Sequence, residues 1–163
     1  MINDEFMSIA VIGMSCRLPK ANNINEFWSN ILYARECYTT FSDEELRESG
    51  VPKEIYSNEN FVRTKGILEN IEYFDADFFD FTPKEASITD PQHRILLETA
   101  WEALEDAGYD ANRFNGRIGI FAGQSMGDYL FMNLYPQIER YLSPKTLQMA
   151  IGNDKDSLTS KIS

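Results

Sequence analysis

Hydrophobic and polar positions alternate along this chain first with the spacing of a strand and then with the spacing of helices. Residues 8–13 (SIAVIG) form a short apolar run that ends in glycine, a pattern that predicts a buried strand. Residues 117–122 (RIGIFA) alternate like a second strand that leads into Gly123. Because helical patterns separate these two segments, the chain is predicted to have an α/β fold with layered elements.

The most clearly patterned helix is predicted over residues 91–107. Asp90 can accept hydrogen bonds from free helix N–H groups, and Pro91 at the first helical position loses none. Gly108 follows, and glycine commonly ends a helix. The predicted helix has an apolar side with Leu97, Trp101 and Leu104, and an acidic side with Glu98, Glu102, Glu105 and Asp106. We interpret the acidic side as a solvated face rather than as a metal site.

Weaker patterns predict two helices near the N-terminus. Asn25 is the expected N-cap of a helix over residues 26–35. Gly50 is expected to close a short helix over residues 43–48. In the first of these helices, one face collects the side chains of Phe27, Trp28, Ile31 and Leu32.

Three further segments carry local signals. Residues 82–87 begin with a threonine and a proline and predict a short helical turn. Residues 127–142 are rich in aromatic side chains and are expected to be helical or looped. Residues 153–162 predict the start of another helix, capped by Asn153 or Asp154.

Composition and charge narrow the class of protein. A length of 163 residues suits one domain, and 43% hydrophobic residues are typical of globular proteins. The formal net charge of −11 argues against nucleic-acid binding, because phosphate neutralisation needs clustered Lys and Arg. No apolar run approaches the roughly 20 residues of a membrane span, and no signal-peptide pattern is present. The sequence therefore predicts a cytoplasmic protein that binds neither nucleic acid nor membranes.

Cysteine and histidine are scarce, which limits the possible chemistry. Cys16 and Cys37 are too few for a disulfide framework and lack metal-ligand spacing, so we expect neither to carry the chemistry. His93 is the only histidine. We interpret it as a first-turn helical residue bonded to backbone or solvent rather than as a general base. No metal site and no directly bound cofactor are predicted.

A G-x-S-x-G pattern at residues 123–127 suggests one enzymatic alternative. The pattern follows a predicted strand, as in the nucleophile elbow of α/β-hydrolases, and would make Ser125 the nucleophile. That fold requires an acidic residue and then a histidine after the serine, whereas His93 precedes Ser125. A glycine-rich turn leaving a strand is the better interpretation.

Several blocks together resemble the β-ketoacyl synthase (ketosynthase) domains of modular polyketide synthases. The most specific block covers residues 72–108, in which DPQHR at residues 90–94 is followed by ETAWEALEDAG. The supporting blocks, in the same order as in the family, are SIAVIGMSCRLP at 8–19, FWSNIL at 27–32, RIGIFAGQSMGDY at 117–129 and GNDKD at 152–156. The resemblance extends over essentially the whole chain from residue 8.

The resemblance implies a partial thiolase-like fold, the N-terminal portion of the first α/β half. Residues 1–7 would then be an N-terminal extension, and residues 8–163 the N-terminal portion of a ketosynthase domain. In this family the nucleophilic cysteine and its two histidine partners lie beyond the matched region. No catalytic residue is therefore assigned. Met149 matches a segment that lines the acyl-chain pocket and is the one predicted substrate-binding residue, with ordinary packing as the alternative.

The family condenses an acyl chain with a malonyl-type extender by decarboxylative Claisen condensation. The resemblance implies an acyl carrier protein with phosphopantetheine-tethered acyl groups, the remainder of the domain, and a second copy in a homodimer as partners of the parent enzyme. We expect this acyltransferase chemistry from the parent domain and no condensation by this chain alone. The alternatives are a non-catalytic scaffold or docking half of a split synthase and, less well supported, a serine hydrolase using Ser125.

Overall fold

The computed structural model describes residues 9–125, 127–136 and 145–162, with side chains from residue 148 onward in the last range. The chain divides into two compact units. One unit is Cys16–Asn70, and the other combines Met1–Ser15 with Ile71–Ser163. Among the helices of the described ranges, none has the length and hydrophobicity of a membrane span.

The Cys16–Asn70 unit begins with helix α1, Ile24–Leu32. The predicted N-cap at Asn25 is wrong by two residues, because Asn23 has the extended backbone of a cap and its Oδ1 accepts from the Glu26 N–H at 2.9 Å. The buried residue of α1 is the polar Asn30, whose amide donates to the Lys20 carbonyl at 2.8 Å. The apolar face identified in the sequence is instead exposed on Phe27, Trp28, Ile31 and Leu32.

The same unit contains two further helices and a short antiparallel pair of strands. Helix α2 (Asp43–Glu48) matches the prediction, begins with a Ser42–Glu45 capping box, and is followed by Gly50 at φ +79°. Helix α3 is Lys53–Tyr56. Strand β1 (Thr39–Thr40) pairs with β2 (Thr64–Lys65).

In the second unit the predicted helices at residues 82–87 and 91–107 are confirmed. Helix α4 is Pro83–Ile88, with a capping box between Thr82 and Glu85. Helix α5 is Pro91–Asp106, with Asp90 as N-cap and Gly108 at φ +72° after its end. These helices follow their sequence signals because caps and prolines act through the neighbouring backbone.

Residues 9–15 lie along the C-terminal half of α5 rather than in a sheet. The predicted buried strand is wrong: the described residues 9–13 form no strand, and Ile9 is 94% exposed. The Met14 N–H donates to Asp106 at 2.8 Å, and the Ser15 hydroxyl donates to Glu102 at 2.5 Å. The acidic side of α5 is therefore a docking face for this segment as well as a solvated one.

The second predicted strand, residues 117–122, is also wrong as an ordered sheet element. Residues 117–122 form no strand, and Phe121 is 99% exposed. An apolar alternation specifies which side chains face a core, but a strand also needs a neighbouring backbone for its hydrogen bonds. No such neighbour occurs among the described residues.

The C-terminal region is helical in short pieces. A π-helical turn, η1, covers Leu130–Leu134, and helix α6 covers Lys145–Asn153. The helix predicted over residues 153–162 is replaced by two 3₁₀ turns, η3 (Lys155–Ser157) and η4 (Thr159–Lys161), and Asp154 is the cap of the first. Of the predicted segment 127–142, the described part up to residue 136 contains η1, and residues 137–142 lie outside the description.

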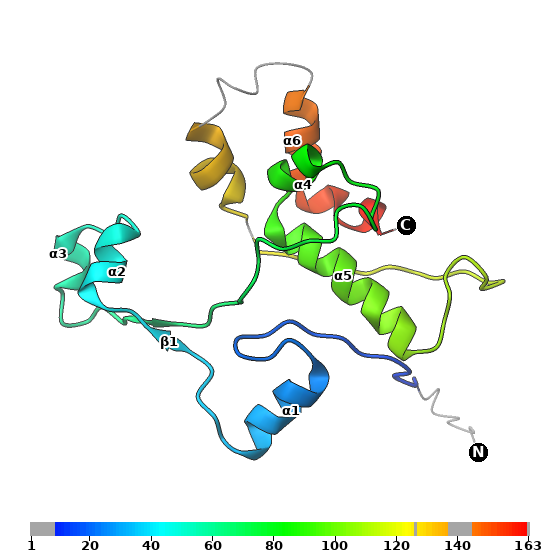
Figure 1. The fold of residues 1–163 in the computed structure, drawn as a ribbon, viewed down its shortest axis with the longest axis horizontal. Helices are drawn as coiled ribbons and strands as arrows, with labels where there is room; N and C mark the ends of the chain where they lie inside the picture. Colours follow the sequence, from blue (N-terminus) through cyan, green and yellow to red (C-terminus); the bar gives the residue numbers. More distant parts are fainter. Residues whose placement is uncertain (1–8, 126, 137–144, 163) are drawn as a thin grey trace, which may run out of the picture. The chain divides into compact units, whose positions relative to one another are not determined.

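Helices α4 and α6 lie side by side (Figure 1). Together with η1 they contribute the hydrophobic cluster of this unit. The cluster consists of Ile88, Leu134 and Met149, with Tyr129 and Leu130 packed against it. A second group of apolar contacts comes from stacked and edge-on aromatic rings, including Phe78 against Trp101 with ring centroids 4.9 Å apart. The contact between Phe78 and Trp101 thus packs the phenylalanine-rich loop before α4 against α5.

Candidate functional site

Polar side chains from α5 and from later segments act on one another near the first turn of α5. We call them the α5 polar cluster: Asp90, His93, Gln124, Asp154 and Lys161. His93 is completely buried. Neither ring nitrogen makes a well-aligned hydrogen bond among the described residues, although the side chain of Gln124 lies close enough to act on the ring as a hydrogen-bonding group. The prediction that His93 bonds to backbone or solvent is therefore wrong, because its surroundings come from segments distant in sequence.

Asp90 links α5 to the end of α6. Its Oδ1 accepts from the Gln92 N–H at 2.8 Å, and its own N–H donates to the Gly152 carbonyl at 3.0 Å. Its Oδ2 is buried without a partner among the described residues and lies against Gly127, where an added Cβ would clash with it. Gly127 is therefore required by the close approach of its backbone to a carboxylate.

The electrostatic environment of His93 favours the neutral imidazole. Burial lowers the pKa of His93, and the ammonium of Lys161 lowers it further. Gln124, Asp90 and Asp154 act in the opposite direction with smaller effect. Burial also lowers the pKa of Lys161. The cluster thus holds an uncharged imidazole, but the described residues place no nucleophile in hydrogen bond with it.

Met149, the predicted substrate-binding residue, lies in the hydrophobic cluster and is 2% exposed. Its carbonyl accepts from the Asn153 amide at 2.7 Å, and the same amide donates to the Ile88 carbonyl at 2.8 Å. Asn153 therefore ties the end of α4 to α6 at the hydrophobic cluster. This position favours packing for Met149, and a contact with substrate stays a prediction.

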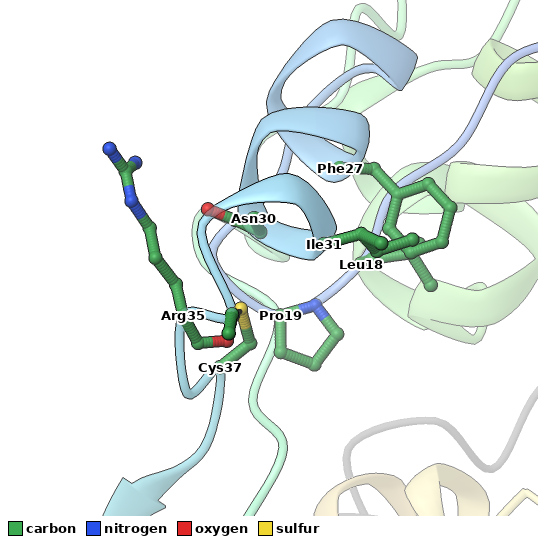
Figure 2. A pocket seen from close by; sticks show the side chains of 8 residues that line it. Leu18, Pro19, Phe27, Asn30, Ile31, Arg35 and Cys37 are labelled. Atoms are coloured by element: carbon green, nitrogen blue, oxygen red, sulfur yellow. Dashed lines mark hydrogen bonds between the residues drawn. The ribbon is translucent and has the colours of Figure 1, made fainter.

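A hollow of about 320 Å³ lies beside α1 within the other unit. Figure 2 shows Leu18, Phe27 and Ile31 together on one side of it, while the guanidinium of Arg35 extends away. The Cys37 thiol donates to the Arg35 carbonyl at 3.4 Å. The lining is mostly apolar, so the hollow offers hydrophobic area and no reactive constellation.

The residues of the hydrolase alternative do not assemble. Ser125 is exposed, whereas His93 is buried and makes no hydrogen bond with it. Cys16 and Cys37 are both half-buried and form no disulfide with each other. Among residues 9–125, 127–136 and 145–162, no group of three metal-ligating side chains is present.

Sequence reasoning missed the partners of His93. Gln124, Asp154 and Lys161 come from segments that follow α5 in sequence and meet it only through the fold. The polar block DPQHR gives no signal of this burial, because polar side chains in a first helical turn are ordinarily exposed.

Comparison with known proteins assigns the chain to a family. Residues 7–163 match the family described as "Beta-ketoacyl synthase, N-terminal domain". A phenolphthiocerol/phthiocerol polyketide synthase of Mycobacterium tuberculosis is 40% identical over 162 residues, which is 96% of this chain and 11% of that protein. Polyketide synthase PksN of Bacillus subtilis is 43% identical over 104 residues, covering 64% of this chain and 2% of that protein. The chain belongs to the β-ketoacyl synthase family.

Solved structures show which fold and which part of it are present. The ketosynthase from module 6 of the bacillaene synthase of Bacillus subtilis aligns with a TM-score of 0.65 and 30% identity over 94% of this chain and 23% of that one. The oxazolomycin ketosynthase domain of Streptomyces albus aligns with a TM-score of 0.74 at 24% identity, covering 93% and 26% respectively, and shows the fold alone. The predicted class, a partial thiolase-like α/β fold, is confirmed, and the chain spans about a quarter of these ketosynthases.

Proposed function

We propose that this chain is the N-terminal framework of a polyketide ketosynthase that joins an acyl chain to a malonyl-type extender by decarboxylative Claisen condensation. The observation that carries the proposal is the match of residues 7–163 to the N-terminal domain of the family, with polyketide synthases among the relatives. Within the proposal, residues 1–7 are an extension and residues 8–163 are domain. The acyl groups reach the enzyme as phosphopantetheine thioesters on an acyl carrier protein.

The chemistry of the condensation supports a framework role. A ketosynthase needs a thiolate nucleophile and donors for the negative charge that develops on the carbonyl oxygen. The chain has one histidine, and its imidazole is completely buried. We therefore propose that the nucleophilic cysteine and its histidines come from the remainder of the domain, that the active parent is a homodimer, and that it works in the cytoplasm.

Exposed apolar surface supports the same proposal. Ile9 and Phe121 are almost fully exposed. They belong to residues 8–13 and 117–122, whose sequence patterns are those of buried strands. Strand-patterned segments with free backbone groups are ready to pair with another strand. The remainder of the ketosynthase domain is the partner that would complete a sheet with them.

The test is reconstitution. The chain is mixed with the polypeptide that corresponds to the rest of the ketosynthase domain, together with an acyl-loaded and a malonyl-loaded carrier protein. The carrier-bound β-ketoacyl product is then measured by mass spectrometry. We expect product from the mixture and none from either polypeptide alone. Product formed by the 163-residue chain alone would contradict the proposal.

A further inference from the structure

Phe78 and Trp101 form an exposed aromatic pair in the second unit. Their ring centroids are 4.9 Å apart, and their planes meet at 83°. Phe78 is 52% exposed and Trp101 is 37% exposed, although large aromatic side chains usually bury most of their area. Two such rings in contact offer a partner a continuous apolar area, which a single exposed side chain does not.

The pair is held in place by its neighbours. Phe78 packs edge-on against Phe79 with centroids 4.9 Å apart, and Phe79 stacks on Phe74 at 5.3 Å. The Phe78 N–H donates to Asp75 Oδ1 at 3.3 Å, and Trp101 lies in the interior of α5. A partner would therefore meet a surface that is already ordered, which lowers the entropy cost of binding.

Carboxylates surround the pair. Residues 71–83 contain four acidic side chains and no Lys or Arg, and residues 95–106 have the same balance. Three exposed carboxylates lie beside the two rings in sequence or one helical turn away, and they form no ion pair among the described residues. We define the acidic aromatic face by Phe78 with Asp77 and Asp80, and by Trp101 with Glu105.

Arg94 and Lys161 bring positive charge to the loop of Phe78, but near its ends. Arg94 directs its Nη1 to the Glu72 carbonyl at 3.5 Å. The Lys161 ammonium lies 5.8 Å from the centroid of the Phe81 ring. Neither cation forms an ion pair with the acidic aromatic face in the described part of the chain, so the carboxylates of the face are left for a partner.

We propose that the acidic aromatic face docks a protein segment with exposed arginine side chains. A guanidinium stacks on aromatic rings and also forms paired hydrogen bonds with carboxylates, so it matches both components of the face. A purely apolar partner fits poorly, because it would bury carboxylates without a counter-charge. Lysine offers the charge without the planar, hydrogen-bonding group.

The probe is a blocked peptide of alternating glycine and arginine, with a lysine peptide of the same length as its match. Each is titrated into the ¹⁵N-labelled 163-residue chain, which has two tryptophans, Trp28 and Trp101. We expect the Trp101 indole N–H signal to shift, the Trp28 signal to stay, and arginine to bind about two- to fivefold more tightly than lysine. Shifts of both indole signals, or equal affinity for the two peptides, would overturn the proposal.

Matched variants separate the rings of the face from exposed rings in general. Trp101→Leu should weaken binding of the arginine peptide by about two- to fivefold. Phe131→Leu is its control, because Phe131 is 61% exposed in η1 of the same unit. Equal effects of the two substitutions would contradict docking at the face.

A second pair of variants separates the face from the net charge of the chain, and it leaves α5 unchanged. The double variant Asp77→Asn/Asp80→Asn should weaken binding by at least about twofold. Glu44→Gln/Glu48→Gln on α2 changes the net charge equally and should weaken it less. Equal losses would show attraction by net charge alone and would overturn the proposal.

The arginine peptide is also titrated in the presence of the polypeptide that corresponds to the rest of the ketosynthase domain. The proposal uses contacts within one unit and does not depend on the proposed function. We expect the peptide to bind with unchanged affinity. Displacement of the peptide would place the face inside the domain and overturn the proposal, whereas product formation in the reconstitution assay reports on the condensation separately.

Discussion

At the scale of single residues, the lack of a side chain at Gly13 allows residues 9–15 to approach the backbone of α5 closely. A Cβ at Gly13 would clash with the Ala103 carbonyl oxygen and lie 2.8 Å from the Ala107 Cβ. Both atoms belong to α5 or its cap and cannot move without disturbing the helix. Glycine is therefore needed for residues 9–15 to dock on α5.

We predict that Gly13→Ala destabilises this docking. The added methyl group meets backbone rather than a flexible side chain, so we expect a loss of about 1–3 kcal/mol in the free energy of unfolding measured by urea titration. Gly123→Ala is the matched control, because nothing lies within 4 Å of a Cβ at that position. Equal stability of the two variants would show that residues 9–15 do not pack against α5.

Asp90 gives a second test at this scale. Asp90→Ala removes the acceptor for the Gln92 N–H, and loss of an N-cap costs about 0.5–2 kcal/mol. Asp90→Asn retains an acceptor oxygen, so we expect it to lose less stability than the alanine variant in the same urea titration. If asparagine and alanine are equivalent, the cap hydrogen bond contributes nothing to stability.

Single residues are predictable from sequence where their role is local. Asp90, Thr82 and Gly50 act on the adjacent turn, and the sequence identifies the elements that they bound. The cap of α1 is displaced from Asn25 to Asn23, since neighbouring asparagines carry the same signal. The burial of His93 is not predictable, because its surroundings reach it only through the fold.

At the scale of elements, helices and strands differ in what they need from the rest of the chain. Helices α2, α4 and α5 take their hydrogen bonds from the helix itself and from capping side chains next to it, and each follows its sequence signal. Residues 8–13 and 117–122 have strand patterns, but a strand takes its hydrogen bonds from a neighbour. Their apolar side chains, such as Ile9 and Phe121, are consequently exposed.

The packing of α4 against α6 depends on Met149. We predict that Met149→Ala costs about 2–5 kcal/mol in the free energy of unfolding, because it leaves a cavity between Ile88 and Leu134. Met149→Leu conserves volume and should cost less than about 1.5 kcal/mol. Thermal and urea unfolding measure both values. A neutral Met149→Ala would argue against packing and leave the predicted substrate contact as the better role for this residue.

At the scale of the whole molecule, the exposed segment 117–122 has the pattern of a strand and would be covered in a complete ketosynthase domain under the proposed function. Phe121 makes almost no contact in this chain, so Phe121→Asp should change its free energy of unfolding by no more than about 0.5 kcal/mol. In the proposed assembly the same charge would be buried in a sheet, which is strongly unfavourable. We therefore predict that Phe121→Asp abolishes association with the rest of the ketosynthase domain.

Size-exclusion chromatography with light scattering measures that association, and Phe121→Tyr is the conservative control. We expect the tyrosine variant to associate like the wild type, because the ring keeps its apolar area. Normal association of Phe121→Asp would mean that residues 117–122 are not part of the interface.

In the proposed function, this chain supplies framework and the reactive thiol belongs to the remainder of the ketosynthase domain. Intact-protein mass spectrometry after incubation with an acyl-loaded carrier protein tests it most directly, because the two polypeptides have different masses. We expect the acyl group on the complementing polypeptide and none on the 163-residue chain. Acylation of Cys16 or Cys37 followed by transfer to the extender would contradict it.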